Sequence, residues 1–194
     1  RFIPQMKNGE PISLNIAKTT NKGYIYDAGE YLTAKVRVKV KGRKGDTLSL
    51  EYGECFLQEG HLWASKKGLR DDQSGYILGP CDFIDLNGET QEIEFFWYRA
   101  FRFIEIECEN RDKLELEITA VPYYYPYEFK GTFECSDESY NKMWDISRHT
   151  LECCSHEILV DCPFFEQQQY GMDSYLESMY ALRLSGDTRI VKKV

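Results

Sequence analysis

The sequence predicts a mainly β protein with a smaller α part, in which an antiparallel β-sandwich is followed by two helices. Up to about residue 122, apolar and polar residues alternate in several short runs separated by turn residues, and no helical pattern intervenes. That arrangement is typical of an antiparallel sandwich. After residues 122–126, an extended connector containing two prolines, the apolar spacing changes to that of a helix.

Charge and hydropathy exclude two classes of partner. The chain has 194 residues, a net charge of -8 and a pI near 5.0. A nucleic-acid-binding protein would normally carry a basic patch, so we expect no nucleic-acid partner. No apolar run approaches the roughly 18 residues that a membrane span requires, so we expect no membrane partner. The length is sufficient for one or two domains with a sizeable core.

The cysteines predict reduced, packed thiols and not a disulfide framework. Their number is odd and none is arranged as Cys-x-x-Cys. They are Cys55, Cys81, Cys108, Cys135, Cys153, Cys154 and Cys162.

The first part of the chain contains the clearest strand. Residues 1–21 form an entry segment with one expected strand. Residues 23–40 follow a period of two, which places apolar side chains on one face and basic side chains in water. The apolar set is Leu32, Ala34, Val36, Val38 and Val40. A turn at residues 41–46 and a second alternating run at residues 47–54 predict a hairpin.

The middle of the sandwich is less regular. Residues 55–90 contain many glycines and predict long loops with short strands, of which residues 75–78 are the best candidate. Loops on a β scaffold often carry ligand contacts. Further strands are expected at residues 91–97, 101–108 and 114–121.

Two helices are expected after the connector. Ser136 is a good N-cap for the first, which has about five turns and ends before Pro163. Asp173 is expected to cap the second, and Gly186 to end it.

Three carboxylates, Asp161, Glu166 and Asp173, lie in the segment between these helices. Glycoside hydrolysis commonly uses two carboxyl groups across the scissile bond, one of them protonated as a general acid. If the rings of Phe165 and Tyr170 shield Glu166, loss of water would raise the pKa of its carboxyl toward the working range of an acid. The alternative is that Asp161 and Asp173 are helix caps and Glu166 is solvated.

Three other patterns favour ordinary structural roles. His149 and Cys153 share a helix face and could both bind zinc, but no second ligand pair has suitable spacing, so no metal is expected. Nothing marks Cys162 as an activated nucleophile. The basic strand residues Lys35, Arg37 and Lys39 are expected to form a solvated face.

The segment between the helices resembles a known signature. Asp161-Cys162-Pro163, Glu166, Gly171 and Asp173 are similar to the Asp-Cys-Pro…Glu…Gly…Asp pattern of bacterial α-L-rhamnosidases of the glycoside hydrolase family 78 type. Residues 133–144 resemble the first helix of that family's (α/α)6 barrel, and residues 185–189 resemble the turn after its second helix. Upstream, residues 26–30, 45–54 and 101–107 resemble the β-sandwich domain that precedes the barrel.

The resemblance implies a fold and a domain arrangement. The expected fold is mainly β with α: a jelly-roll-like antiparallel β-sandwich followed by the first helices of a truncated (α/α)6 barrel. The sandwich would span residues 1–122, the connector residues 123–134, and the first barrel helices residues 135–194.

The resemblance also implies roles for four residues. Glu166 would be the catalytic general acid that protonates the glycosidic oxygen. Asp161 and Asp173 would bind rhamnose hydroxyls, and Tyr170 would form an apolar wall for the sugar. This sequence departs from the family where Phe165 replaces a frequent arginine and where residues 167–169 are uncharged, which leaves the substrate open.

The implied activity is the release of terminal α-L-rhamnose from a rhamnose-containing glycan or glycoside, with inversion and without a cofactor. The compartment, bacterial cytoplasm or periplasm, stays open. The family's general base is a glutamate far downstream, so the chain is expected to be a fragment that is inactive alone. Exposed apolar helix faces are expected to cause self-association. Two alternatives stay open: a carbohydrate-binding or accessory sandwich without catalysis, and a scaffold with no glycan site.

Overall fold

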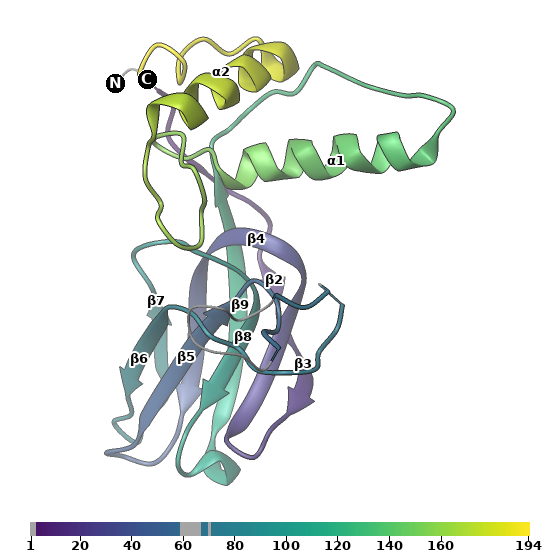
Figure 1. The fold of residues 1–194 in the computed structure, drawn as a ribbon. Helices are drawn as coiled ribbons and strands as arrows, with labels where there is room; N and C mark the ends of the chain where they lie inside the picture. Colours follow the sequence, from purple (N-terminus) through teal and green to yellow (C-terminus); the bar gives the residue numbers. More distant parts are fainter. Residues whose placement is uncertain (1–2, 59–66, 70) are drawn as a thin grey trace. The chain divides into compact units, whose positions relative to one another are not determined.

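The computed structural model describes residues 3–58, 67–69 and 71–194, and its ribbon is shown in Figure 1. Contacts divide the chain into two compact units. One, which we call the sheet unit, is Glu10–Pro122; the other, the helical unit, is Arg1–Gly9 with Tyr123–Val194. The predicted fold class, mainly β with two helices at the C-terminal end, is confirmed.

The sheet unit is built from antiparallel strands. They are β2 (Ile12–Ser13), β3 (Asn15–Thr19), β4 (Gly23–Lys41), β5 (Thr47–Gly53), β6 (Cys81–Asp85), β7 (Gln91–Glu94), β8 (Arg99–Glu107) and β9 (Glu115–Tyr124), with a 3-10 turn at Arg111–Lys113. The main path through the sheet runs β9-β4-β8-β5-β6, while β2 pairs with β9, and β3 and β7 pair with β4.

The long strand β4 curls this sheet. Its first half pairs with β3 and β8, and its second half pairs with β7 and β9. The register shifts between Asp27 and Leu32, where Gly29 has a φ of 84°. A bulge of this kind bends a strand and increases its twist. The apolar side chains predicted to face inward, Leu32, Ala34, Val36, Val38 and Val40, are all buried in the main core.

The predicted hairpin of residues 23–40 with residues 47–54 is wrong. Both segments are strands, but β8 lies between β4 and β5 in the sheet. The end of β4 has no free edge to offer β5, because Arg37–Val40 pair with β7 on one side and with β9 on the other.

The strand predicted at residues 75–78 is also wrong. Within the described residues of this loop, Tyr76 makes only an isolated bridge to Leu57. Gly75 has a φ of 103°, and a Cβ there would lie 2.0 Å from the Leu57 carbonyl oxygen, so the chain turns at this close approach. Residues 59–66 and 70 of the predicted loop lie outside the described part. Strand β6 follows this loop, within residues 55–90, where short strands were expected but this one was not located.

The helical unit contains α1 (Glu138–Cys153), α2 (Gly171–Ser185) and the short strand β1 (Lys7–Asn8), which pairs with the end of β9. The predicted N-cap of α1 is wrong by one residue: the carboxylate of Asp137, and not Ser136, accepts the Ser139 N–H at 2.9 Å. Gly186 ends α2 with a left-handed φ of 70°, as predicted.

Asp173 does not cap α2. The N-cap residue is Tyr170, and Asp173 lies in the first turn of the helix. A carboxylate in this turn is still favoured by the exposed N–H groups and the helix dipole.

Two small cores hold the helical unit. One joins Leu151 of α1 to Ala181 and Leu184 of α2. The other contains Ile3, Tyr125, Leu159 and Ile190. All seven cysteines are free thiols, and Cys55, Cys108, Cys153 and Cys154 are buried, as predicted for packed thiols. Neither helix is long and apolar enough to cross a membrane, among the residues that the structure describes.

Candidate functional site

The segment between α1 and α2 forms a closed loop whose base is Asp161 and Gln168. The Asp161 N–H donates to the Gln168 carbonyl oxygen at 2.9 Å, and the Gln168 N–H donates to Asp161 Oδ1 at 3.2 Å. Asp161 therefore closes the loop and is not a helix cap, which makes the capping alternative wrong for this residue.

A tight turn at the tip of the loop presents Glu166. The Gln167 N–H donates to the Cys162 carbonyl oxygen at 3.1 Å, and the Glu166 N–H donates to Cys162 Sγ at 3.3 Å. Gln167 has a φ of 52°, the one positive φ among the described residues other than glycine. Left-handed backbone at a non-glycine residue is uncommon and often occurs at functional sites. The sulfur of Cys162 thus supports the loop geometry.

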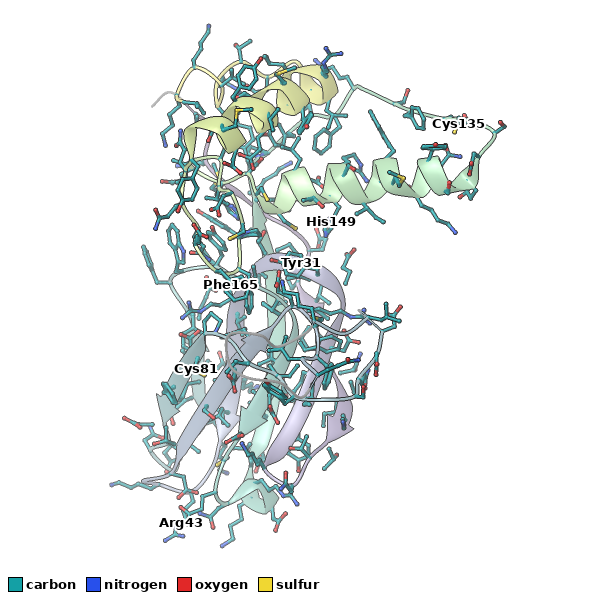
Figure 2. All side chains as sticks on the ribbon, in the orientation of Figure 1. Tyr31, Arg43, Cys81, Cys135, His149 and Phe165 are labelled. Atoms are coloured by element: carbon teal, nitrogen blue, oxygen red, sulfur yellow. The ribbon has the colours of Figure 1, made fainter. Side chains whose placement is uncertain are left out.

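The Glu166 side chain is exposed, and its partner is Tyr170. The Tyr170 hydroxyl donates to Glu166 Oε2, and this bond raises the pKa of the Tyr170 phenol. The expected shielding by Phe165, which Figure 2 labels on this loop, is not present, because that ring is 67% exposed. The neighbouring Phe164 takes the buried position, and the two rings meet edge to face.

A fourth carboxylate, Glu177, belongs to the same region. It lies one helical turn after Asp173 on α2, and spacing alone gave no reason to select it. Burial, and then the charges of Asp173 and Asp161, raise the pKa of Glu177 to about 7. Burial is a tertiary property, so only the folded chain identifies this residue.

The charge of Asp161 acts on two other residues of this region. One is Tyr170, which is hydrogen-bonded to Glu166. The other is Glu177, on which the charge of Asp173 also acts. The fold therefore gathers all four predicted residues, Asp161, Glu166, Tyr170 and Asp173, around one loop and the start of one helix. The arrangement offers a solvent-accessible carboxyl that could transfer a proton, beside carboxylates that could accept hydrogen bonds from hydroxyl groups.

The residues considered for zinc have structural surroundings. His149 Nε2 lies 3.6 Å from Cys153 Sγ. His156 is buried and stacks on Tyr123, and burial lowers the pKa of its imidazole to about 4. Burial raises the pKa of the Cys154 thiol to about 12. Within residues 3–58, 67–69 and 71–194, no group of three or more His, Cys, Asp or Glu side chains is arranged to hold a metal.

Two family models match the chain. Residues 17–124 match a model described as the concanavalin-like domain of bacterial α-L-rhamnosidases. Residues 128–194 match a model described as their 6-hairpin glycosidase domain. The two matches together cover most of the sequence, including the whole loop between α1 and α2.

One curated protein and two solved structures are similar to most of this chain. A curated α-L-rhamnosidase of Formosa agariphila is 27% identical over 184 residues, which are 93% of this chain and 19% of that protein. The solved α-L-rhamnosidase of Dictyoglumus thermophilum matches 98% of this chain and 21% of its own, with a TM-score of 0.73 and 20% identity. A rhamnosidase of Klebsiella oxytoca, solved with rhamnose bound, matches 99% of this chain and 44% of its own, with a TM-score of 0.72 and 15% identity. The chain thus spans about a fifth of the length of the curated relative.

Proposed function

The chain belongs to the bacterial α-L-rhamnosidase family, and we propose that residues 160–173 form the acid side of a site that releases terminal α-L-rhamnose with inversion. The substrate would be a rhamnose-containing glycan or glycoside. No cofactor is required for this chemistry, which needs only a pair of carboxyl groups and water.

The observation that carries the proposal is the geometry of Glu166. Its carboxyl stands exposed at the tip of a tight turn, with one oxygen held by the Tyr170 hydroxyl. A general acid must come within hydrogen-bonding distance of the oxygen that it protonates. The bond from Tyr170 occupies Oε2, which leaves Oε1 to carry the proton toward a glycosidic oxygen.

The two aspartates would bind the sugar. Ionised carboxylates accept hydrogen bonds strongly, so Asp161 and Asp173 are suited to hold rhamnose hydroxyls and orient the ring. Tyr170 directs its hydroxyl to Glu166 and is 43% exposed. Its ring is therefore available as an apolar wall for the C–H face of the sugar.

Inversion also requires a carboxylate that activates water on the opposite face of the sugar, roughly 6.5–9.5 Å from the acid. Because the chain spans 19% of its curated relative, we propose that a glutamate elsewhere in a longer polypeptide supplies this base. The 194 residues alone are then expected to be inactive.

We further propose a sandwich domain at residues 1–122, a connector at residues 123–134 and helices of the catalytic domain at residues 135–194.

Kinetics of the longer protein test the roles of the two aspartates. Asp161→Asn and Asp173→Asn are each expected to raise KM for an aryl α-L-rhamnoside by about 10–100-fold, since each removes a charge-assisted hydrogen bond of roughly 1.5–3 kcal/mol. Asp145→Asn, which changes an exposed residue on α1, is the matched control and should leave KM unchanged. Rhamnose binding that survives both aspartate variants, without hydrolysis by the parent protein, would support the carbohydrate-binding alternative.

A further inference from the structure

Glu177 occupies an environment that the proposed chemistry leaves unexplained. It lines a cavity of about 530 Å³ between α1 and α2, together with apolar side chains such as Trp144, Leu151 and Leu184. Its Oε2 atom is buried and has no hydrogen-bond partner in the described part of the chain. A buried carboxylate without a partner is unfavourable, whereas the protonated acid avoids the cost of a buried charge.

The ionisable groups around Glu177 come from every element that packs on it. They are Asp173, Tyr180 and Arg183 of α2, Arg148 of α1, Cys154 at the end of α1, Tyr127 of the connector, and Asp161 of the loop. Arg148 and Arg183 line the same cavity, and the guanidinium of Arg148 lies over the Phe129 ring. The charges that raise the pKa of Glu177 are those of Asp173 and Asp161.

Glu177 is coupled to the two aspartates that we propose bind the sugar. Residues four apart on a helix lie on one face, so Glu177 and Asp173 are neighbours on α2. Asp161, on the loop that presents Glu166, acts on Glu177 through its charge as well. Glu177 and Asp161 are half-buried, whereas Asp173 is exposed. Ionisation of Glu177 adds a third negative charge to this group, and like charges repel one another.

We propose that Glu177 is a positioning residue for the sugar: as a neutral acid it leaves Asp161 and Asp173 as ionised acceptors, and as an anion it weakens their hold on rhamnose. This inference rests on the proposed function. Repulsion from an ionised Glu177 turns the side chains of the aspartates away from it, and this displacement weakens their hydrogen bonds to the sugar hydroxyls. The raised pKa of Glu177, about 7, places the transition near neutral pH.

The ionisation of Glu177 can be measured directly. A pH titration of its side-chain carboxyl carbon by NMR, on the 194-residue chain, is expected to give a midpoint near 7, with assignment by the loss of that signal in Glu177→Gln. A midpoint near the ordinary value of 4.5 would overturn the inference, because Glu177 would then be an anion throughout the working range.

The functional consequence is a change in KM with pH. In the longer protein, KM for an aryl α-L-rhamnoside is expected to rise up to about tenfold between pH 6 and pH 8. Glutamine has nearly the shape of the neutral acid and cannot ionise, so Glu177→Gln should keep the low KM across this range. Asp145→Asn, on the exposed side of α1, should keep the profile of the parent protein. A purely structural role would alter stability without flattening the KM profile.

The possible failures are distinguishable. An active protein whose KM profile is the same with and without Glu177→Gln overturns the role of Glu177 and leaves the proposed function standing. A longer protein that hydrolyses no rhamnoside at any pH overturns the proposed function, and the role of Glu177 in it falls as well.

Discussion

In the loop between α1 and α2, each of several residues holds a different part of the candidate site in place. Asp161 closes the loop through Gln168, and Gln167 turns the backbone so that Glu166 faces solvent. Tyr170 then holds one carboxylate oxygen while serving as the N-cap residue of α2. Each of these residues fixes a neighbour, so the geometry of Glu166 depends on short-range contacts within the helical unit.

His156 gives the unfolding free energy a pH dependence. Its imidazole is 3% exposed, and its pKa is about 4 in the folded chain against 6.5 when solvated. Between pH 6.5 and pH 4 the unfolded state therefore binds more protons, so the unfolding free energy falls as the pH is lowered through this window. The lowered pKa corresponds to a loss of roughly 3 kcal/mol by pH 4.

Denaturant unfolding at several pH values checks this expectation. Compared with the parent chain, His156→Gln should lose little of its unfolding free energy across the same window. Equal pH dependence in the parent chain and in His156→Gln would contradict the assignment.

At the scale of elements, the start of α1 offers a test of the observed cap. Ser136 and Asp137 are both good N-cap residues, but the side chain of Asp137 makes the bond. Asp137→Ala is expected to lower the unfolding free energy by about 1 kcal/mol. Ser136→Ala is the matched control and should change it by less than about 0.5 kcal/mol. Chemical denaturation decides between them, and a larger loss with Ser136→Ala would restore the cap that the sequence predicted.

The pairing of β4 with β8 offers a second test. A Cβ on Gly23 would lie 1.7 Å from the Ile106 carbonyl oxygen, where β4 begins to pair with β8. Because backbone atoms cannot move aside easily, Gly23→Ala is expected to destabilise the chain by about 2–4 kcal/mol.

The comparison for this variant is Gly29→Ala, which has open space around the new Cβ but a φ of 84°. Left-handed backbone costs an alanine about 1–2 kcal/mol, so this variant should be the milder of the two. Thermal or denaturant unfolding of both variants measures the difference, and equal losses would argue against the close approach at Gly23.

For the molecule as a whole, the exposed apolar side chains of the helical unit predict self-association of the 194-residue chain. Several large ones on α1 and α2 face solvent: Tyr140, Met143, Ile146, Met172, Tyr175 and Tyr180. Large apolar side chains that gather on a surface usually mark a site that binds something. Sedimentation velocity across a concentration series should show dimers or larger species, fewer of them in Met143→Lys. A single monomeric species at high concentration would contradict this expectation.

Local patterns in the sequence predicted much of the fold, and long-range effects explain most of the errors. The alternation through Val36, Val38 and Val40 predicted a buried strand face, because period two is a property of the strand itself. The partner of that strand could not be predicted, since β7 and β9 reach its edges from distant parts of the chain. The cap was missed by one residue because serine and aspartate are both favoured at the N-cap position.

In the candidate site, too, local sequence patterns predicted some residues, and only the folded structure identified others. Asp161, Glu166, Tyr170 and Asp173 were predicted from a short motif, which lies within the residues that the glycosidase-domain model matches. Glu177 was not found, because its distinctive property arises from burial against α1 and from two charges that folding brings near it. The exposure of Phe165 was likewise invisible, since Phe164 and Phe165 are the same residue type and only packing selects which is buried.

The central claim is that Glu166 is the general acid, and the most direct test compares leaving groups. In the longer protein, Glu166→Gln is expected to lower kcat about 10²–10⁴-fold for methyl α-L-rhamnoside, whose alkoxide must be protonated as it leaves. For 2,4-dinitrophenyl α-L-rhamnoside the loss should be about tenfold or less, because that phenolate leaves without a proton. Losses of equal size for both substrates, or normal turnover of the methyl glycoside, would contradict the account.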